Sequence, residues 1–212
     1  MTIHDYFGDW IDVFDLPQLN GTINCLNLLY AKNPVVPEYA NVFRAFTLCS
    51  RKECRVVMLG QDPYPQSGVA TGILFGNAPD TKVLSPSLKI IMDSVMSDSD
   101  SSFDITLESW ARQGILLINS ALTCETGKIG SHVMLWRPFL SKLLIKLSND
   151  NNGIVYVLFG SQAQSFVPYI KHGYILKERH PAYYARLGIP MPGDVFVEVN
   201  SLIKGTPIKW CA

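Results

Sequence analysis

Four short, largely apolar runs recur along the chain, and each ends at a glycine or a polar residue. They span residues 55–59, 115–118, 154–159 and 174–177. Continuous runs of this length, rich in β-branched and aromatic residues, are typical of strands buried on both faces. The pattern therefore predicts a parallel sheet covered by helices.

Helical spacing of apolar residues occupies much of the sequence between these runs. Ser85 precedes Pro86, a pairing typical of a helix N-cap and first turn, and Pro138 is expected to break the longest helix near its start. Ser161 is expected to cap a helix after the third run, and a polar loop is predicted over residues 97–102. The predicted helices span residues 23–31, 86–96, 107–113, 135–147 and 195–203.

Alternation of strands and helices predicts an α/β fold, a single-domain three-layer α/β/α architecture with a central four-stranded parallel sheet. No internal repeat and no Gly/Ser-rich or Pro-rich linker divides the sequence, so one domain is predicted over residues 1–212. Within it, residues 1–45 are expected to form a peripheral helix and loop region.

Polar residues follow each predicted strand. Asp62 comes after the first run, Asn119 after the second, Ser161 after the third and His180 after the fourth. Ligands of parallel sheets bind beyond the carboxyl ends of the strands. The sequence thus predicts one site built from four loops, although each residue alone has an ordinary explanation as a turn, cap or surface residue.

Composition is that of an ordinary globular protein: 212 residues, 48% of them hydrophobic and 17% charged. The formal net charge is zero, so composition does not by itself predict nucleic-acid binding. Cations nonetheless gather in one C-terminal stretch that contains a single acid, Glu178. These residues are Lys171, Lys177, Arg179, His180 and Arg186.

The five cysteines include no CxxC pair, which disfavours a disulfide framework, a zinc site and an iron–sulfur cluster. Reduced thiols in an intracellular protein are expected, with no metal and no cofactor. The longest apolar runs are too short to cross a bilayer, and no basic and apolar leader opens the chain, so neither membrane insertion nor secretion is predicted.

The polar strand ends lie within motifs that resemble family 1 uracil-DNA glycosylases. The segments GQDPY at residues 60–64 and GILF at 72–75 resemble the water-activating motif of that family. LESWARQGILLIN at 107–119 is similar to the segment that ends in its uracil-reading asparagine. LFGSQAQ at 158–164, HPA at 180–182 and TPIKW at 206–210 match later motifs, so the resemblance covers roughly residues 50–210.

The resemblance implies a monofunctional hydrolase that removes uracil from DNA and initiates base excision repair. Asp62 would hold the attacking water, and His180 would stabilise charge on the leaving uracil. Substrate-binding residues would be Gln61, Tyr64, Phe75 and Asn119. DNA-binding residues would be Pro63, Ser87, Ser161, Pro181, Ala182, Tyr183, Tyr184 and Arg186.

The sequence departs from the family pattern at three places. Pro65 stands where most relatives carry a histidine, and the stretch 185–193 is shorter than in common members. The family's Ser-Pro-Leu after His-Pro is replaced by Ala182-Tyr183-Tyr184. The family's wedge residue, the leucine that fills the gap left by the flipped base, is therefore absent. Tyr184 aligns with that leucine and Tyr183 is nearly as good a candidate, since an aromatic ring can insert between bases.

The implied partners are single- or double-stranded uracil-containing DNA, free uracil as product and a DNA-mimicking inhibitor protein, with the enzyme acting as a monomer. It would act inside the cell: in the cytoplasm of a bacterium or for a phage, in the nucleus or a viral factory otherwise. Three alternatives stay open: a non-enzymatic assembly subunit with the same fold, as among some viral relatives, an iron–sulfur uracil glycosylase of another family, and a generic nucleotide-binding protein. For the last, no GxGxxG or Walker-type loop follows any predicted strand.

Overall fold

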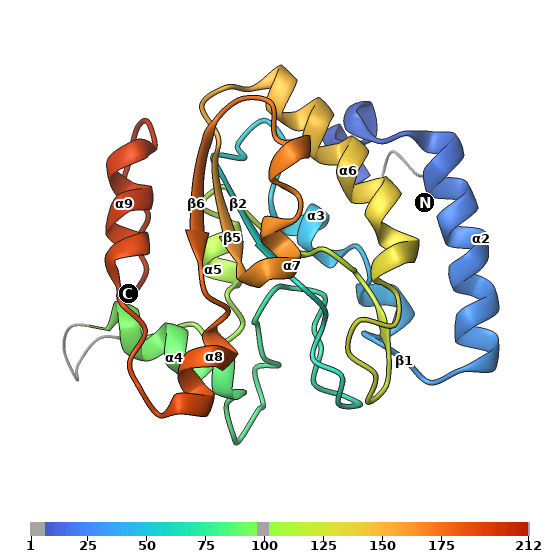
Figure 1. Ribbon diagram of the computed structural model, residues 1–212, viewed down its shortest axis with the longest axis horizontal. Helices are drawn as coiled ribbons and strands as arrows, with labels where there is room; N and C mark the ends of the chain where they lie inside the picture. The colour runs from blue at the N-terminus through green and yellow to red at the C-terminus, as the bar shows by residue number, and fades with distance from the viewer. Residues whose placement is uncertain (1–6, 97–101, 212) are drawn as a thin grey trace.

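A computed structural model describes residues 7–96 and 102–211. At its centre lies a four-stranded parallel sheet in the order β3-β2-β5-β6 (Figure 1), which confirms the predicted fold class. Every strand begins or ends within one residue of its predicted bounds. The strands are β2 (Val56–Gly60), β3 (Ile115–Asn119), β5 (Val155–Phe159) and β6 (Tyr174–Glu178).

The register of the sheet brings the polar strand ends level with one another. Gly60 pairs with Asn119, and Phe159 pairs with Glu178. Because neighbouring parallel strands end at the same height, the loops that follow them converge at one edge.

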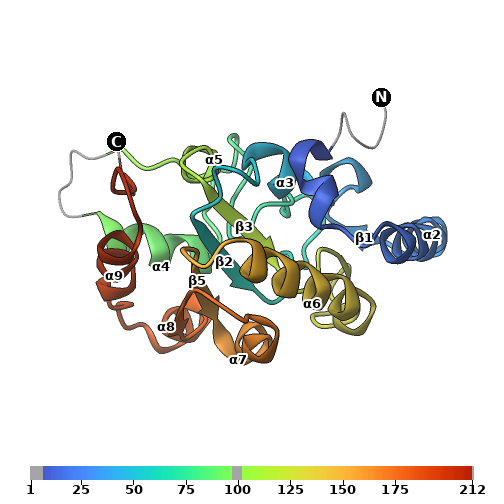
Figure 2. The same cartoon turned by 90° about the horizontal axis from the view of Figure 1, so that it is seen from above.

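Alternate residues of the strands face two separate apolar cores, and this creates three layers (Figures 1 and 2). Val57 and Leu59 pack on one side, and Val56 and Met58 on the other. The first core is covered by η1 (Gly8–Val13), α2 (Leu16–Lys32), α3 (Arg44–Leu48) and α6 (Val133–Asp150). The second is covered by α4 (Pro86–Val95), α5 (Glu108–Ala111), α8 (Pro181–Leu187) and α9 (Asp194–Leu202).

Short elements complete the fold. The two-stranded antiparallel ribbon of β1 (Val35–Val36) and β4 (Cys124–Glu125) ties the N-terminal region to the segment that follows β3. The others are η2 (Tyr39–Asn41), α7 (Gly160–Gln164) and η3 (Val167–Tyr169).

The N-terminal helix is longer than its apolar pattern predicts. Asp15 caps α2 by accepting a hydrogen bond from the Gln18 amide at 3.0 Å, so the helix begins at Leu16 rather than at residue 23. The segment before it is well packed, because Trp10 is fully buried and donates its indole N–H to the Cys49 carbonyl at 2.6 Å.

Two helix predictions are wrong. Pro138 does not break α6, which runs continuously through it; the bond that Pro138 cannot make is to the carbonyl of Met134, a residue 77% exposed and open to water. Ser161 does not cap α7, because that helix begins at Gly160, one residue earlier. The polar loop predicted over 97–102 falls, except for residue 102, outside the described residues.

No helix within residues 7–96 and 102–211 has the length and apolar character needed to cross a membrane. All five cysteines are free thiols.

Candidate active site

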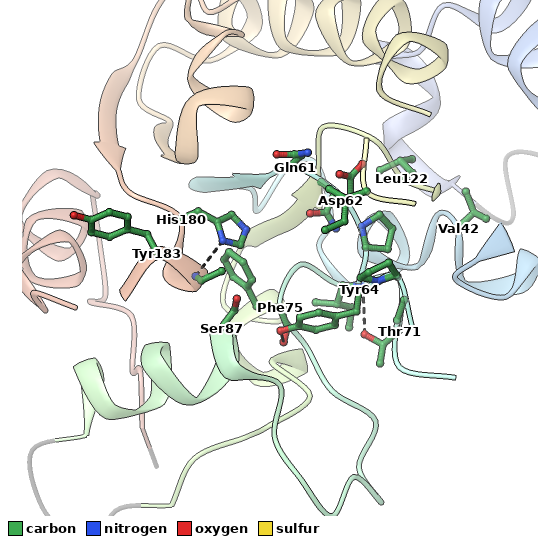
Figure 3. Close-up of a pocket in the computed structure, with 18 of the residues that line it drawn as sticks. Val42, Gln61, Asp62, Tyr64, Thr71, Phe75, Ser87, Leu122, His180 and Tyr183 are labelled. Atoms are coloured by element: carbon green, nitrogen blue, oxygen red, sulfur yellow. Dashed lines mark hydrogen bonds between the residues drawn. The ribbon is translucent and has the colours of Figure 1, made fainter. Parts of the chain in front are cut away.

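A cavity of about 460 Å³ opens at the carboxyl edge of the sheet (Figure 3). It collects most of the predicted site residues, and Asp62 and Leu122 lie on one side of it while Phe75 and His180 lie on the other. The predicted residues that line it are Gln61, Asp62, Pro63, Tyr64, Phe75, Ser87, Asn119, His180, Ala182, Tyr183 and Arg186.

The loop after β4 holds the Asp62 side chain in place through the backbone amide of Gly130. Asp62 Oδ2 accepts the Gly130 amide at 2.9 Å, while Oδ1 is buried and has no protein partner within the described ranges. Burial raises the pKa of the Asp62 carboxyl, and the nearby Gln61 side chain and the Gly130 amide oppose that rise. One carboxylate oxygen is therefore available to a small polar ligand such as water.

Phe75 forms an aromatic wall of the cavity. Its ring packs edge to face against Phe159 and His180, with both centroid distances 5.4 Å. The backbone of Phe75 has φ +62°, a left-handed conformation that is rare for a bulky residue. Strain of this kind persists where the surroundings fix the residue, and it is frequent at functional sites.

Asn119, the last residue of β3, carries a buried Oδ1 that has no hydrogen-bond partner among the described residues. Gly60 lies beside it, and a Cβ atom at Gly60 would stand 2.8 Å from this oxygen and would also meet the Leu74 side chain. The absence of a side chain at Gly60 thus leaves the Asn119 amide in its place.

We expect Gly60→Ala to lower kcat/KM for the substrate by about tenfold, because misplacing a binding group by about 1 Å costs up to ~10²-fold and Leu74 can yield in part. Steady-state kinetics would measure the loss. Gly21→Ala is the matched control, since a Cβ there meets nothing within 4 Å. Equal activities of the two variants would contradict the role given to Gly60.

His180 has a defined tautomer in this structure. Its Nδ1 accepts the Ala182 amide at 3.2 Å, so in the neutral ring the proton lies on Nε2. Burial lowers the pKa of His180, and the nearby positive charge of Arg186 lowers it further. Gly160 permits this arrangement, because a Cβ atom at Gly160 would stand 3.1 Å from the His180 Cβ.

Only some of the predicted DNA-binding residues line the cavity, whereas both predicted catalytic residues do. Ser87, on the first turn of α4, and Arg186 line the cavity, whereas Ser161 is exposed on α7 and does not. Pro181 is buried at the start of α8 and also does not line it.

The preference for Tyr184 over Tyr183 as the wedge residue is not supported by the structure. Tyr184 is only 8% exposed, packs in the second core and donates its hydroxyl hydrogen to Glu178 at 2.7 Å. Tyr183 lines the cavity instead, and the Arg179 guanidinium lies 4.4 Å from the centroid of its ring.

Several residues of the site have no distinct signal in the sequence. Gly130 contributes only a backbone amide, and Val42 and Ile129 contribute apolar surface from segments outside the quoted motifs. Leu122, three residues after Asn119, adds further apolar surface. Gly130 has φ +82°, a backbone conformation that favours glycine, but the sequence does not reveal that its amide meets Asp62.

The order of the strands, the position of the cavity and the polar groups of Asp62, Asn119 and His180 define an α/β enzyme. Its ligand site lies at the carboxyl edge of a parallel sheet. The model of the uracil DNA glycosylase superfamily matches residues 46–204. Proteins named uracil-DNA glycosylase are 36% identical in Campylobacter jejuni, covering 87% of this chain and 83% of the relative, and 36% in Pseudoalteromonas translucida, covering 83% and 84%. The chain belongs to the uracil-DNA glycosylase superfamily.

Solved structures agree on the fold. The crystal structure of mimivirus uracil-DNA glycosylase matches with a TM-score of 0.77 at 21% identity, covering 98% of this chain and 91% of that one. The enzyme of Nitratifractor salsuginis matches with a TM-score of 0.63 at 21% identity, covering 95% and 92%.

Proposed function

We propose that this protein hydrolyses the N-glycosidic bond of a flipped-out uracil in DNA, releases free uracil and leaves an abasic site, the first step of base excision repair. The observation that carries the proposal is one cavity in which a half-satisfied carboxylate, Asp62, lies across from a neutral His180, with Phe75 and Asn119 beside them.

Cleavage of the bond needs two kinds of charge stabilisation. The sugar develops oxocarbenium character, and the departing uracil becomes negative. Asp62 orients and activates the water through Oδ1 and stabilises the cationic sugar. His180 donates its Nε2 hydrogen to the uracil carbonyl oxygen on which negative charge grows, without transferring the proton.

Recognition of the base uses three side chains. Phe75 stacks on the ring, and the Asn119 amide offers one donor and one acceptor, which match uracil O4 and N3–H but not the reversed edge of cytosine. Tyr64 stands where the methyl group of thymine would have to go. Its pKa is raised by burial, so the phenol stays neutral.

Tyr64→Ala is expected to admit thymine, because the space of the ring becomes free for the 5-methyl group. A pocket discriminates about 10–200-fold per methylene, so thymine release should rise by at least about tenfold over the wild type. The assay is release of thymine from a defined oligonucleotide. Retained uracil activity with no thymine release would contradict the assignment of Tyr64 as the wall, meaning the side chain that excludes the 5-methyl group of thymine.

DNA would be bound by the hydroxyl groups of Ser87 and of the exposed Ser161, which can bind phosphates without a basic surplus. Ala182, whose amide donates to His180 Nδ1, would add packing contact alone. Arg186 is the one Lys or Arg among the described residues that lines the cavity, and it would add a positive charge. Tyr183 is the side chain we assign to the gap left by the flipped base, since this residue lines the cavity whereas Tyr184 is buried.

Tyr183→Ala is expected to lower turnover on duplex DNA by about tenfold, with a smaller loss on single strands, because base stacking contributes about 1–3 kcal/mol. The matched control is Tyr184→Phe, which keeps the buried ring and loses only the bond to Glu178. The measurement is the ratio of duplex to single-strand kcat/KM. If only the Tyr184 variant changes that ratio, the assignment must be reversed.

The whole proposal is tested by incubating purified protein with single- and double-stranded oligonucleotides that contain one uracil, followed by alkali cleavage at abasic sites. Strand breakage that depends on uracil is the expected result. DNA binding without breakage would instead indicate a non-enzymatic assembly subunit with this fold.

An inhibitor that mimics DNA is a further partner we propose, because a mimivirus UNG variant has been crystallised in complex with UGI. It would cover the face that contains Ser87, Tyr183 and Arg186. Since the substrate is DNA, the protein would act inside the cell.

A further inference from the structure

Ser85 occupies the N-cap position of α4 but does not cap the helix. Its Oγ instead accepts a hydrogen bond from Asn77 Nδ2 at 3.0 Å. Both residues are buried, at 9% and 1% exposure. A serine at this position would ordinarily satisfy a free amide of the first turn, so its hydroxyl is committed elsewhere.

The Ser85 side chain connects Asn77 with Tyr64. The Ser85 side chain and the Leu88 backbone amide both contact the Tyr64 phenol, and Tyr64 donates its own hydrogen to the Phe75 carbonyl at 3.0 Å. Because the Phe75 carbonyl can only accept, the Tyr64 hydrogen points to it, and the phenol oxygen is left to accept from the Ser85 side.

Phe75 is suited to end this chain. Its left-handed backbone belongs to a tight turn over residues 71–76, in which Thr71 Oγ1 donates to the Gly76 carbonyl at 3.2 Å. The turn therefore holds two features together, the ring that stacks on the base and the carbonyl that holds the Tyr64 hydroxyl.

We propose that Asn77 and Ser85 are positioning residues that fix the Tyr64 ring and thereby set discrimination against a 5-methyl group on the base. This inference rests on the proposed function, in which Tyr64 is the wall. Neither residue lines the cavity, so both act through Tyr64.

The physical argument is that a steric wall discriminates only as well as it resists displacement. Thymine differs from uracil by one methyl group, and a small shift of the ring makes room for it. The hydrogen bonds to the phenol oppose that shift, because moving the ring would leave buried polar groups unpaired. Removing Ser85 Oγ takes away the one side chain that contacts the hydroxyl and leaves it with the Phe75 carbonyl and the Leu88 amide.

The test compares release of uracil, 5-fluorouracil and thymine from otherwise identical oligonucleotides. Ser85→Ala and Tyr64→Phe are each expected to raise the ratio of thymine to uracil kcat/KM by about tenfold. The 5-fluorouracil ratio should stay within about twofold, because fluorine is only slightly larger than hydrogen. Ser85→Thr, which keeps the hydroxyl, should restore wild-type discrimination.

A double-mutant cycle separates a relay from independent effects. If Ser85 acts through the phenol, Tyr64→Phe combined with Ser85→Ala is no more permissive than either single variant. Asn77→Ala should change the thymine ratio in the same direction. Matched controls are Ser94→Ala on the same helix, whose hydroxyl bonds only the Ile91 carbonyl, and Asn200→Ala, whose amide bonds Ile208. Both should lower thermal stability alone.

Each outcome decides between the two ideas. If Tyr64→Ala releases thymine while Ser85→Ala and Tyr64→Phe keep the wild-type ratio, the relay is overturned and the wall stands. If Tyr64→Ala releases no thymine, the wall and the relay fall together. Wild-type protein that leaves uracil in place overturns the proposed function itself.

Discussion

Replacing Asp62 with asparagine is expected to lower kcat for uracil release by about 10²–10⁴-fold, the range that a positioned general base contributes. Asparagine has nearly the same shape and can still accept the Gly130 amide, so the loop keeps its anchor. What disappears is the negative charge that activates water and stabilises the cationic sugar. Single-turnover kinetics would measure the chemical step directly.

The pH profile gives this prediction a second readout. Burial raises the pKa of Asp62 above the ordinary carboxyl value of 3.8, and only the ionised form can act as base. Wild-type kcat/KM should therefore fall as the pH drops through a midpoint above 3.8, and Asp62→Asn should lose that limb. Asp194→Asn, an exposed carboxylate on α9, is the control. A profile unchanged in Asp62→Asn would contradict the assignment.

Replacing His180 with alanine is expected to lower kcat by about 10²–10³-fold, the loss that follows removal of one donor to a developing oxyanion. His180→Gln should recover part of the rate, because its amide can still donate a hydrogen bond. His172→Ala, an exposed histidine, is the matched control.

The charge state of His180 separates this role from general acid catalysis. Burial and Arg186 lower its pKa below 6.5, so the ring is neutral at pH 7 and is protonated only on acidification. Protonation at Nδ1 would also break the bond from the Ala182 amide. Nitrogen NMR of the ring should show an unprotonated Nδ1 at pH 7. A cationic ring there would exclude the neutral-donor role.

The sheet and its polar edge were predictable because strands buried on both faces leave continuous apolar runs. Asp62, Asn119 and His180 each follow such a run, and parallel strands end at one edge, so their convergence needed only the topology. Gly130 was not predictable as a partner of Asp62, since a backbone amide leaves no mark in the sequence and its position depends on the packing of the loop after β4.

The segment after His180 shows why the sequence could not choose between Tyr183 and Tyr184. Matching it to the family motif favours Tyr184, but the segment is the helix α8, in which Tyr184 is buried. Successive helical residues turn by about 100°, so the two rings differ in burial: Tyr184 lies within the second core, whereas Tyr183 is partly buried against that core and lines the cavity. Three apolar or aromatic residues in a row gave no helical period from which to choose.

The two cores separate the tasks of the site between different parts of the protein. The loop that anchors Asp62 adjoins Leu122 of the first core, whereas Phe75 belongs to the second core and Tyr183 packs against it. Substitutions in the second core therefore reach both the Phe75 ring and, through it, His180, while the anchor of Asp62 beside the first core stays in place.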